Sequence, residues 1–285
     1  MKKLNVGTLG PEGTFSQEAT EKICHRFRTD YNIIFESTIS KVFASLTDQS
    51  DVIVVPLENI EAGSVVSTLN NLLKYQNLKI IGELDLRIRH NLGGFGSIKG
   101  VSHVYAHPQS HAQSEDYLDT ELNNVNIIHT ASNSESAIKL TQHKNPAYAA
   151  ILPDKALTMY NIPVLKADIQ NNNDNITRFI AIAHDETINR IGLTNKGNKT
   201  SILVDPRKDH PGLLFSILEI FAKNNINLSK IESRPSKRKL GDYVFFIDIS
   251  GNRQMFENCR EQLERITNIR LLGSYNNLED KNEPF

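Results

Sequence analysis

Several residue types that often define a protein class are scarce or absent in this sequence. Among 285 residues there is no tryptophan, and there are only 2 cysteines and 3 methionines. Cys24 and Cys259 lie far apart along the chain, so we expect no disulfide framework and favour a reducing compartment. No apolar run approaches the roughly 20 residues that cross a bilayer. Gly10 and Pro11 interrupt the N-terminus before an apolar stretch of signal-peptide length. These absences predict a soluble cytoplasmic protein.

An excess of charge of either sign is also missing. The sequence has 32 Lys and Arg against 33 Asp and Glu. This balance provides no general field that would attract nucleic acid or an anionic membrane, so neither is a predicted partner. The length exceeds that of a typical single domain, and two folding units are therefore expected.

Residues 1–185 alternate short apolar runs with helical patterns, which is typical of βαβ units around a mostly parallel sheet. A late strand predicts two lobes with a crossover, lobe 1 at about 1–83 plus 166–185 and lobe 2 at about 84–165. Clefts between such lobes are where α/β proteins bind ligands. The predicted strands are Leu4–Leu9, Val52–Val55, Leu78–Glu83, Val101–Ala106, Asn126–His129, Ala147–Ile151 and Arg178–Ala183.

The remainder of the chain has a different composition. Residues 186–198 are polar and weakly periodic, which indicates a linker. Residues 199–275 alternate in the order strand, helix, strand, strand, helix, strand, so we predict a small α+β unit there. Residues 276–285 are charged and predicted to form a loose tail.

The segment GPEGTFS, residues 10–16, follows the first predicted strand and precedes a predicted helix. Gly10 and Gly13 permit a tight turn, and Thr14 or Ser16 can cap the helix. Free backbone N–H groups and the helix dipole would then face an anion. An ordinary strand-to-helix turn explains the same residues equally well.

The segment VVPLENIEAGSV, residues 54–65, ends a buried strand with a carboxylate and an amide. Glu58 and Asn59 are expected at the carboxyl end of this strand, facing a ligand site. The alternative is that they cap a helix beginning near Ser64. Capping explains a single polar residue better than it explains the whole group, so the functional interpretation is favoured.

The segment HPQSHAQS, residues 107–114, also follows a strand, and its Pro108 favours a helix start. Gln109 and Gln113 are four residues apart and would share one helix face. His90, His107 and His111 do not have the spacing of metal ligands, so no metal site is predicted.

The segment TASNSESA, residues 130–137, precedes another predicted helix. Ser132 or Asn133 is expected to cap that helix, with Glu135 completing a capping box. Binding of an anion at the same helix end is the alternative. The local sequence favours the cap.

The segment NDNITRF, residues 173–179, is a polar loop that enters an apolar strand. It places the hydroxyl of Thr177 beside Arg178, whose guanidinium can bind a carboxylate through two parallel hydrogen bonds. Hydroxyls, amides, helix N-termini and this arginine together would suit a small dianion. The sequence contains no nucleophile elbow and no candidate catalytic triad.

In order and spacing, GPEGTFS, VVPLEN with GSV, HPQSHAQ, TAS with ESA, and NITRF resemble the prephenate dehydratase family over about residues 4–275. The resemblance implies an α/β, periplasmic-binding-protein-like catalytic domain of two lobes around a central cleft. It implies a C-terminal α+β, ferredoxin-like ACT domain at 199–275. The family converts prephenate to phenylpyruvate in phenylalanine biosynthesis, usually as a dimer or tetramer and without a metal or organic cofactor.

The resemblance also implies roles for individual residues. Thr177 would donate a hydrogen bond or proton to the departing hydroxyl, while Arg178 binds a carboxylate with Phe179 packed behind it. The other positions that match family site residues are Glu58, Asn59 and Gln113 for catalysis, and Thr14, Ser16 and Ser132 for substrate binding.

Two C-terminal segments, DHPGLL at 209–214 and IESRPSKRKLGDYVFFIDI at 231–249, resemble the phenylalanine-binding segments of the family's ACT domain. The implied effector residues are Gly212, Leu213, Leu214, Glu232, Ser233 and Arg234. Dimer packing is the alternative explanation of these segments. Phenylalanine would favour one arrangement of a dimer and lower activity.

The sequence departs from the family pattern at several of these segments. The departures are Ile60, Val66, Ala106, Ser114 and Asn133, and several replace a polar residue. They leave open a relative of neighbouring chemistry that decarboxylates prephenate without aromatising it. A catalytically silent sensor of an aromatic amino acid is a second alternative. The presence of Thr177, Arg178, Glu58 and Asn59 favours the dehydratase.

Overall fold

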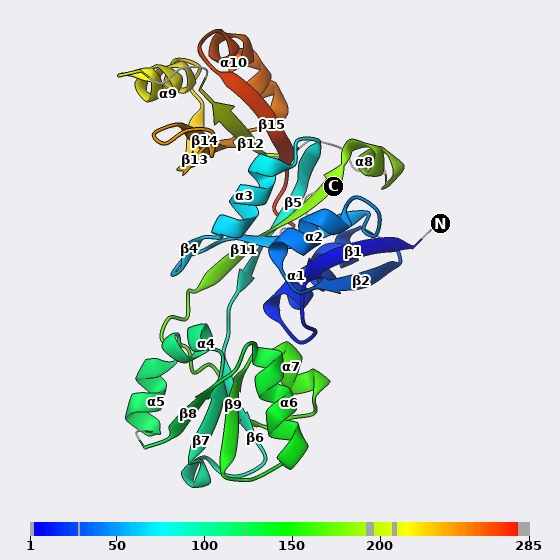
Figure 1. Cartoon of the computed structure of the whole chain (residues 1–285), viewed down its shortest axis with the longest axis vertical. Helices are drawn as coiled ribbons and strands as arrows, with labels where there is room; N and C mark the ends of the chain where they lie inside the picture. The colour runs from blue at the N-terminus through cyan, green and yellow to red at the C-terminus, as the bar shows by residue number, and fades with distance from the viewer. Residues whose placement is uncertain (1–2, 28, 123, 192–196, 207–209, 279–285) are drawn as a thin grey trace. The chain divides into compact units, whose positions relative to one another are not determined.

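The computed structural model describes residues 3–27, 29–122, 124–191, 197–206 and 210–278 (Figure 1). The chain forms two compact units, one of residues 1–71 and 85–179 and the other of residues 72–84 and 180–285. Two long strands, β5 (Leu78–Arg87) and β11 (Ile176–His184), contribute residues to both units. The boundary between the units therefore does not coincide with the predicted linker at 186–198.

The first sheet takes its strands from the two ends of the predicted catalytic region. Its spatial order is β2 (Tyr31–Glu36), β1 (Leu4–Leu9), β3 (Val52–Asn59), β11 and β5, with β4 (Gly63–Ser64) paired to β3. β1 is parallel to both β2 and β3, as the βαβ pattern predicts. The helices that connect these strands are α1 (Phe15–Arg26), α2 (Ile39–Ser45) and α3 (Val66–Lys74).

The second sheet takes its strands from residues 91–166. Its order is β10 (Val164–Lys166), β6 (Asn91–Gly94), β9 (Tyr148–Leu152), β7 (His103–Ala106) and β8 (Asn126–His129). β7 is parallel to β8 and β9, whereas β6 is antiparallel to β9 and β10. The connecting helices are η1 (Ile98–Gly100), α4 (Pro108–Ala112), α5 (Glu115–Glu121), α6 (Asn133–His143) and α7 (Asp154–Met159).

Alternation along β9 explains why helices cover both faces of the second sheet. Ala149 and Ile151 belong to one core cluster with Leu118 of α5, while Ala150 and Leu152 belong to another with helices α6 and α7. Successive side chains of a strand point to opposite faces, so a continuously apolar strand needs cover on both. Figure 1 shows α5 on one side of this sheet and α6 with α7 on the other.

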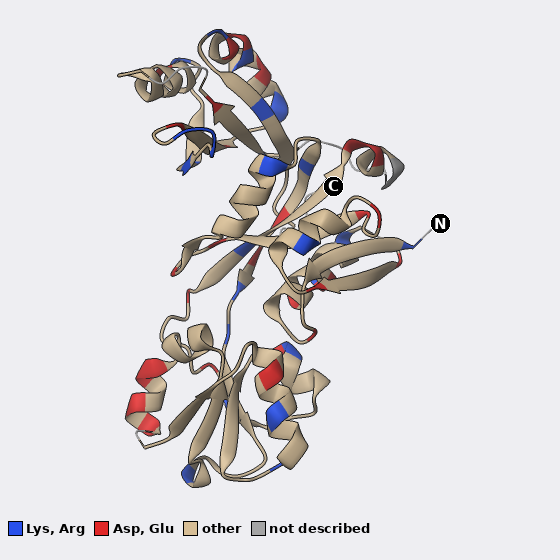
Figure 2. Ribbon diagram, in the orientation of Figure 1, with Lys and Arg blue, Asp and Glu red and all other residues tan. Residues whose placement is uncertain are grey.

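In Figure 2 the charged residues of α5 are all acidic. Its sequence EDYLDTE has acidic residues in the first turn, Glu115 and Asp116, and no basic residue in the last turn. Acidic side chains near a helix N-terminus interact favourably with the helix dipole.

The third sheet has the order β13 (Asn227–Pro235), β14 (Tyr243–Ser250), β12 (Lys199–Asp205) and β15 (Asn268–Tyr275). Each strand pair in it is antiparallel. Helices α9 (Leu213–Lys223) and α10 (Arg253–Ile266) pack into one apolar core with this sheet. Along the chain the order is strand, helix, strand, strand, helix, strand, which confirms the predicted α+β unit.

Part of the first sheet packs with this C-terminal region inside the second unit. Arg270 of β15 donates to the carbonyl oxygen of Leu72, in the last turn of α3, and at 2.9 Å to that of Tyr75, just after the helix. Lys79 of β5 donates to the Leu271 carbonyl oxygen at 2.7 Å, and Lys199 forms an ion pair with buried Glu83. An ion pair and three hydrogen bonds to backbone carbonyl oxygens thus join the segment 72–84 to the third sheet.

The predicted linker and tail differ from the structure. Residues Asp185–Ile191 form a helix, α8, at the start of the predicted linker, and residues 192–196 lie outside the described part. Asn276 and Leu278 are not loose, since their backbones bond to Glu83 at 3.1 and 2.7 Å and Leu278 is buried against Gly82. An apolar Leu278 side chain explains this docking, and residues 279–285 lie outside the described part.

Candidate active site

The side chain of Asn59 organises the edge of the first sheet where β3 ends. Its Oδ1 accepts hydrogen bonds from the backbone N–H groups of Glu61 and Ala62, at 3.1 and 2.9 Å. These two donors fix which way the amide faces, because an amide nitrogen in that position would oppose two N–H groups. Asn59 therefore caps the β3–β4 turn, and not the helix near Ser64 that was the alternative.

The amide nitrogen of Asn59 consequently faces β11. It lies 2.9 Å from Thr177 Oγ1, 2.7 Å from Asn175 Oδ1 and 3.1 Å from the Ile176 carbonyl oxygen. Asn59, Asn175 and Thr177 are each less than 10% exposed. In this arrangement Thr177 Oγ1 accepts a hydrogen bond from Asn59, so its own proton remains available to a different acceptor.

Glu58 and Arg178 form a second pair at the same edge. The Arg178 Nη1 to Glu58 Oε2 distance is 4.0 Å, and the arginine side chain is 11% exposed. Successive residues alternate between sheet faces, so Glu58 and Arg178 leave their strands on the face opposite to Asn59 and Thr177. At the end of a sheet, side chains from both faces can reach a ligand that lies beyond the last strand residues. Phe179, the next residue, is buried.

Gln113 ends helix α4 and contacts two titratable side chains. Its Nε2 donates to Glu61 Oε2 at 2.9 Å, and its Oε1 lies 3.0 Å from His90 Nε2. Asn175 Nδ2 also donates to Glu61 Oε2, at 3.3 Å. Glu61 thereby joins Gln113 to the Asn59, Asn175 and Thr177 group.

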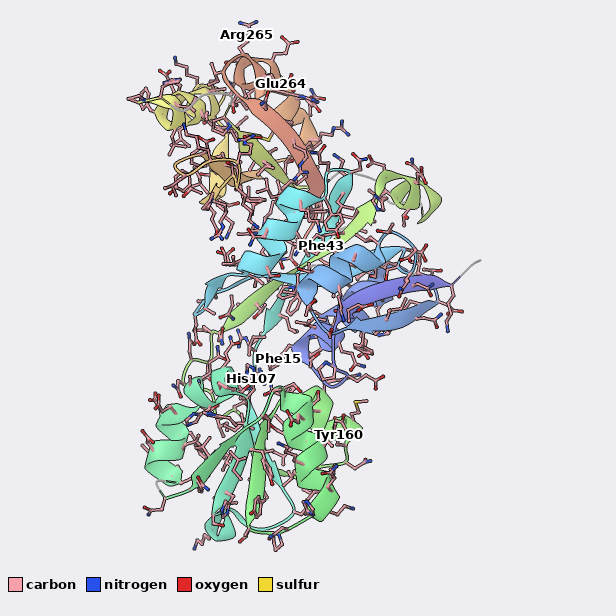
Figure 3. All side chains as sticks on the ribbon, viewed as in Figure 1. Phe15, Phe43, His107, Tyr160, Glu264 and Arg265 are labelled. Atoms are coloured by element: carbon pink, nitrogen blue, oxygen red, sulfur yellow. The ribbon has the colours of Figure 1, made fainter. Side chains whose placement is uncertain are left out.

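The start of α1 also contacts this group of residues, through His90. Phe15 makes an edge-to-face contact with His90, with ring centroids 5.5 Å apart. Gly13 has a φ of +82°, which disfavours other residues, and a Cβ there would make a tight contact of 3.1 Å with Ser134 Oγ. Ser134 in turn donates to the Glu12 carbonyl oxygen. Figure 3 labels Phe15 at the start of α1 and His107 before α4.

Three predicted substrate-binding residues have structural roles. Thr14 is the N-cap of α1 and accepts from the Gln17 N–H, and Ser132 is the N-cap of α6 and accepts from the Glu135 N–H at 3.0 Å. Glu135 accepts from the Ala131 N–H at 2.6 Å, one residue before the N-cap N–H that a capping box uses, so the predicted box forms only in part. Ser16 is buried in the first turn of α1.

Burial lowers the pKa of two histidines near this site. Burial lowers the pKa of His90 below its usual value, and this effect outweighs the hydrogen bond to Gln113 and the charge of Glu61, which both raise it. Burial likewise lowers the pKa of His107, followed by the charge of His129. His107 is the N-cap of α4, with Pro108 in the first turn as predicted. Among the described residues no group of three or more His, Cys, Asp or Glu is arranged to hold a metal ion.

The predicted effector residues lie in the second unit. Gly212 is the N-cap of α9 with a φ of +86°, Leu213 is buried, and Leu214 is 37% exposed. On β13, Glu232 pairs with Lys230 at 3.3 Å and Ser233 is exposed. The Nε of Arg234 is buried without a hydrogen-bond partner among the described residues. Asp209 lies outside the described residues.

Three residues of the site had no role assigned from the sequence, namely Glu61, His90 and Asn175. The strand period could have identified Asn175, since it lies two positions before Thr177 and therefore on the same face. No local pattern connects His90 or Glu61 to Gln113, because these contacts join positions 23 and 52 residues apart.

Comparisons with known proteins show which family the chain belongs to. The family model for prephenate dehydratase matches residues 6–187, and the model for the ACT domain matches residues 201–267. A prephenate dehydratase from Methanocaldococcus jannaschii is 38% identical over 277 residues, covering 96% of this chain and 98% of its own. One from Bacillus subtilis is 31% identical over 282 residues, covering 95% and 98%.

Among solved structures, a prephenate dehydratase from Arthrobacter aurescens in complex with L-Phe has a TM-score of 0.84. It is 29% identical and covers 99% of this chain and 92% of its own. The predicted fold class, a periplasmic-binding-protein-like α/β pair of lobes followed by an ACT domain, is thereby confirmed.

Proposed function

We propose a function from one premise: this chain belongs to the prephenate dehydratase family, a family of carbon–oxygen lyases, and carries an ACT domain. On that basis the protein converts prephenate to phenylpyruvate with loss of carbon dioxide and water, as a step of phenylalanine biosynthesis. Phenylalanine regulates this activity by binding at the ACT domain.

The reaction needs little covalent help from the protein. The bond between the ring and its carboxylate breaks, and its electron pair enters the ring as carbon dioxide leaves. The bond to the ring hydroxyl breaks at the opposite carbon, and a proton completes the departing water. Because the product ring is aromatic, the main requirements are to hold a dianion and to assist the departure of hydroxide.

The orientation of Asn59 is the observation that carries this proposal. Two backbone N–H groups fix its Oδ1, so its Nδ2 donates to Thr177 Oγ1. The Thr177 hydroxyl is then occupied as an acceptor and free to act as a donor, which is the role that a departing hydroxide requires. A proton that Thr177 gives up returns from solvent after turnover.

The remaining residues act on the charges of the substrate. Gln113 Nε2 has a second hydrogen, beyond the one given to Glu61, which can be donated to a substrate oxygen. Arg178 is a carboxylate ligand, and Glu58 at 4.0 Å holds its guanidinium in place. Thr14, Ser16 and Ser132 mark helix N-termini whose dipoles favour a nearby carboxylate.

Regulation is proposed from the second unit. The relative from Arthrobacter aurescens was solved with L-Phe, and this chain covers 92% of it. Gly212, Leu213 and Leu214 with Glu232, Ser233 and Arg234 are the effector residues we propose. We expect phenylalanine to lower activity by favouring one arrangement of the protein.

We further propose a cytoplasmic homodimer or homotetramer. Apolar side chains on one helix of the ACT domain, Leu214, Phe215 and Leu218, are 37%, 68% and 36% exposed. A second copy would cover them. Both Cys24 and Cys259 are buried free thiols, which fits a reducing compartment. No helix in the described ranges is both long and apolar enough to cross a bilayer.

Incubation of the purified protein with prephenate, followed by separation of the products, tests the function. We expect phenylpyruvate and carbon dioxide. A dihydro-hydroxyphenylpyruvate would instead establish the non-aromatising decarboxylase, and unchanged prephenate would favour a sensor without catalytic activity. Prephenate must be analysed at neutral pH beside a protein-free control, because acid alone aromatises it.

A further inference from the structure

We infer that His90 is a positioning residue that sets the direction of the Gln113 side-chain amide, so that this amide donates to the substrate rather than accepts. His90 does this as the neutral tautomer with the proton on Nε2, which donates to Gln113 Oε1. The inference rests on the proposed function, because it concerns how Gln113 meets prephenate.

The partners of Gln113 admit a single consistent assignment. Gln113 lies 2.9 Å from the carboxylate of Glu61 and 3.0 Å from the ring of His90. An ionised carboxylate only accepts, so the amide nitrogen must face Glu61 and the amide oxygen must face His90. The ring nitrogen opposite that oxygen must then be protonated. The reversed amide would place an oxygen against the carboxylate.

The other ring nitrogen of His90 supports the same tautomer. His90 is 1% exposed, and its Nδ1 has no hydrogen-bond partner among the described residues. A proton on Nδ1 would be a buried donor without an acceptor, which destabilises that tautomer. A bare Nδ1 costs less, and the charged ring is disfavoured because burial lowers the pKa of His90. The titratable groups acting on the ring are Glu61 and His107.

The backbones of His90 and Gln113 are held together independently of their side chains. The His90 carbonyl oxygen accepts from the Ile169 N–H at 2.8 Å, and the Gln113 carbonyl oxygen accepts from the Asn171 N–H at 2.7 Å. Between them, Gln170 Oε1 accepts from the His90 N–H at 2.9 Å. The segment 169–171 thus fixes the backbones of both His90 and Gln113. Loss of the imidazole should therefore release the direction of the amide while leaving its position unchanged.

The direction of the amide matters because the substrate carries two carboxylates and a hydroxyl. With Oε1 held by His90, the remaining hydrogen of Nε2 is the part of Gln113 that can face a ligand. A flipped amide would present a carbonyl oxygen to an anion. Phe15 packs against the His90 ring at 5.5 Å, which restricts rotation of the imidazole.

The tautomer can be measured without substrate. In the full-length wild-type protein with ¹⁵N-labelled histidine, we expect His90 to show the pattern of a neutral ring protonated at Nε2 at about pH 7 to 8, above the usual pKa of histidine. A ring protonated at Nδ1, or a ring that is charged at pH 7, would overturn the inference. Because this measurement uses no prephenate, failure of the proposed function and failure of this inference are separated.

Kinetics test whether His90 acts through Gln113. His90→Leu should lower kcat/KM for prephenate by about 10- to 100-fold, the effect of misdirecting one donor to a charged group. His90→Gln, which can offer an N–H at the position of Nε2, should recover most of that loss. His103→Leu removes a different histidine ring, at the start of β7 and stacked on Tyr148, and should leave activity unchanged.

A double-mutant cycle gives the decisive comparison. If His90 acts only by directing the amide, His90→Leu should cost nothing further in a Gln113→Ala background. An equal loss in both backgrounds would show a general structural effect and reject the positioning role. Thermal melting of each variant, followed by circular dichroism, identifies any variant that is not folded at the assay temperature. Where a variant is not folded, the tautomer of His90 measured in the wild-type protein remains the test of the inference.

Discussion

The catalytic candidates and the effector candidates differ in how completely the chain surrounds them. Asn59, Asn175 and Thr177 are buried and bonded to one another within the first unit. In the second unit Gly212 and Ser233 are exposed. The same protein therefore contains one group of polar residues that is buried and already assembled, and another of which some members, such as Gly212 and Ser233, are exposed.

The physical chemistry of the two groups differs accordingly. A buried amide must satisfy its hydrogen bonds within the fold, so its direction is set before a substrate arrives. Exposed residues on an edge strand such as β13 leave contacts to be made by a ligand or a second copy. The activity should therefore be sensitive to single-atom changes among the buried catalytic candidates. The effector candidates should instead respond to a bound ligand or a second copy of the chain.

The largest expected effect is at Thr177. Thr177→Ala removes the proposed donor to the departing hydroxyl, so we expect turnover to fall by about 10²-fold or more, the usual scale for a general acid. Steady-state kinetics with prephenate measure this effect. Thr177→Ser keeps the hydroxyl and should retain much of the activity. Near-normal turnover in Thr177→Ala would reject its assigned role.

A change of one atom at Asn59 should have the next largest effect. Asn59→Asp keeps an acceptor for the Glu61 and Ala62 N–H groups but replaces the donor that faces Thr177. The threonine hydroxyl would then donate to the new carboxylate and lose its availability to the substrate. We expect kcat to fall by about 10- to 100-fold.

Asn59→Asp has a matched control at the same edge. Asn172→Asp alters a half-buried asparagine whose Oδ1 accepts from the Asp174 N–H, so the acceptor is preserved. It should change kcat less than about 2-fold. If Asn59→Asp were as active as this control, the proposed direction of the Thr177 proton would be wrong.

Gly212 tests the outward-facing group. Its φ of +86° is unfavourable for other residues, although a Cβ would meet nothing within 4 Å. Gly212→Ala therefore adds strain of about 1–2 kcal/mol without a clash. If phenylalanine binds the present conformation, its half-inhibitory concentration should rise by about 10-fold while the uninhibited rate is maintained.

Asn225→Ala is the control for Gly212→Ala. Asn225 is an exposed residue of the same unit with a φ of +54°, outside both predicted phenylalanine-binding segments, so alanine there also adds backbone strain. It should leave inhibition by phenylalanine nearly unchanged. Equal effects of the two substitutions would show that strain anywhere in this unit weakens inhibition, and would remove the case for a local effector site.

The smallest expected effect concerns the two thiols, one in each unit. Burial, followed by the charge of Glu21, raises the pKa of Cys24 to about 12, and burial also raises the pKa of Cys259. Because the thiolate is the reactive form, a raised pKa slows labelling at pH 8, and the rate should increase as the pH rises. Because both thiols are buried, labelling also requires local opening of the structure around each of them.

Phenylalanine should slow the labelling of Cys259 a few-fold and leave that of Cys24 unchanged, since a ligand stabilises the unit that binds it. Cys24→Ala and Cys259→Ala variants, each with one remaining thiol, allow the two rates to be followed by mass spectrometry. If phenylalanine slowed the labelling of Cys24 alone, the effector would bind in the first unit, and the assignment of the effector candidates to the second unit would be wrong.

Much of the fold follows from local patterns. β1 and β8 have the predicted bounds, because each is a short apolar run between turn residues. The helix cap at Ser132 and the helix start at Pro108 were also readable, since capping involves residues three or four apart. β6 was missed because its sequence NLGG has two glycines, which disfavour a strand.

The candidate site was only partly predictable. Glu58, Asn59, Gln113 and Thr177 were identified by resemblance to a family, and the strand period would have added Asn175. The contact of His90 with Gln113 depends on a segment near residue 170 that holds both backbones. No periodicity or spacing encodes a contact of this kind, because it depends on how distant segments pack.

The sequence alone determined the alternation of strands and helices, the helix caps and the identity of the polar groups, because each depends on neighbours within a few residues. Tertiary structure alone decided which amide faces which hydroxyl and which ring nitrogen carries a proton. Those choices follow from burial, where every donor needs an acceptor, and the partners are supplied by residues far away in the chain.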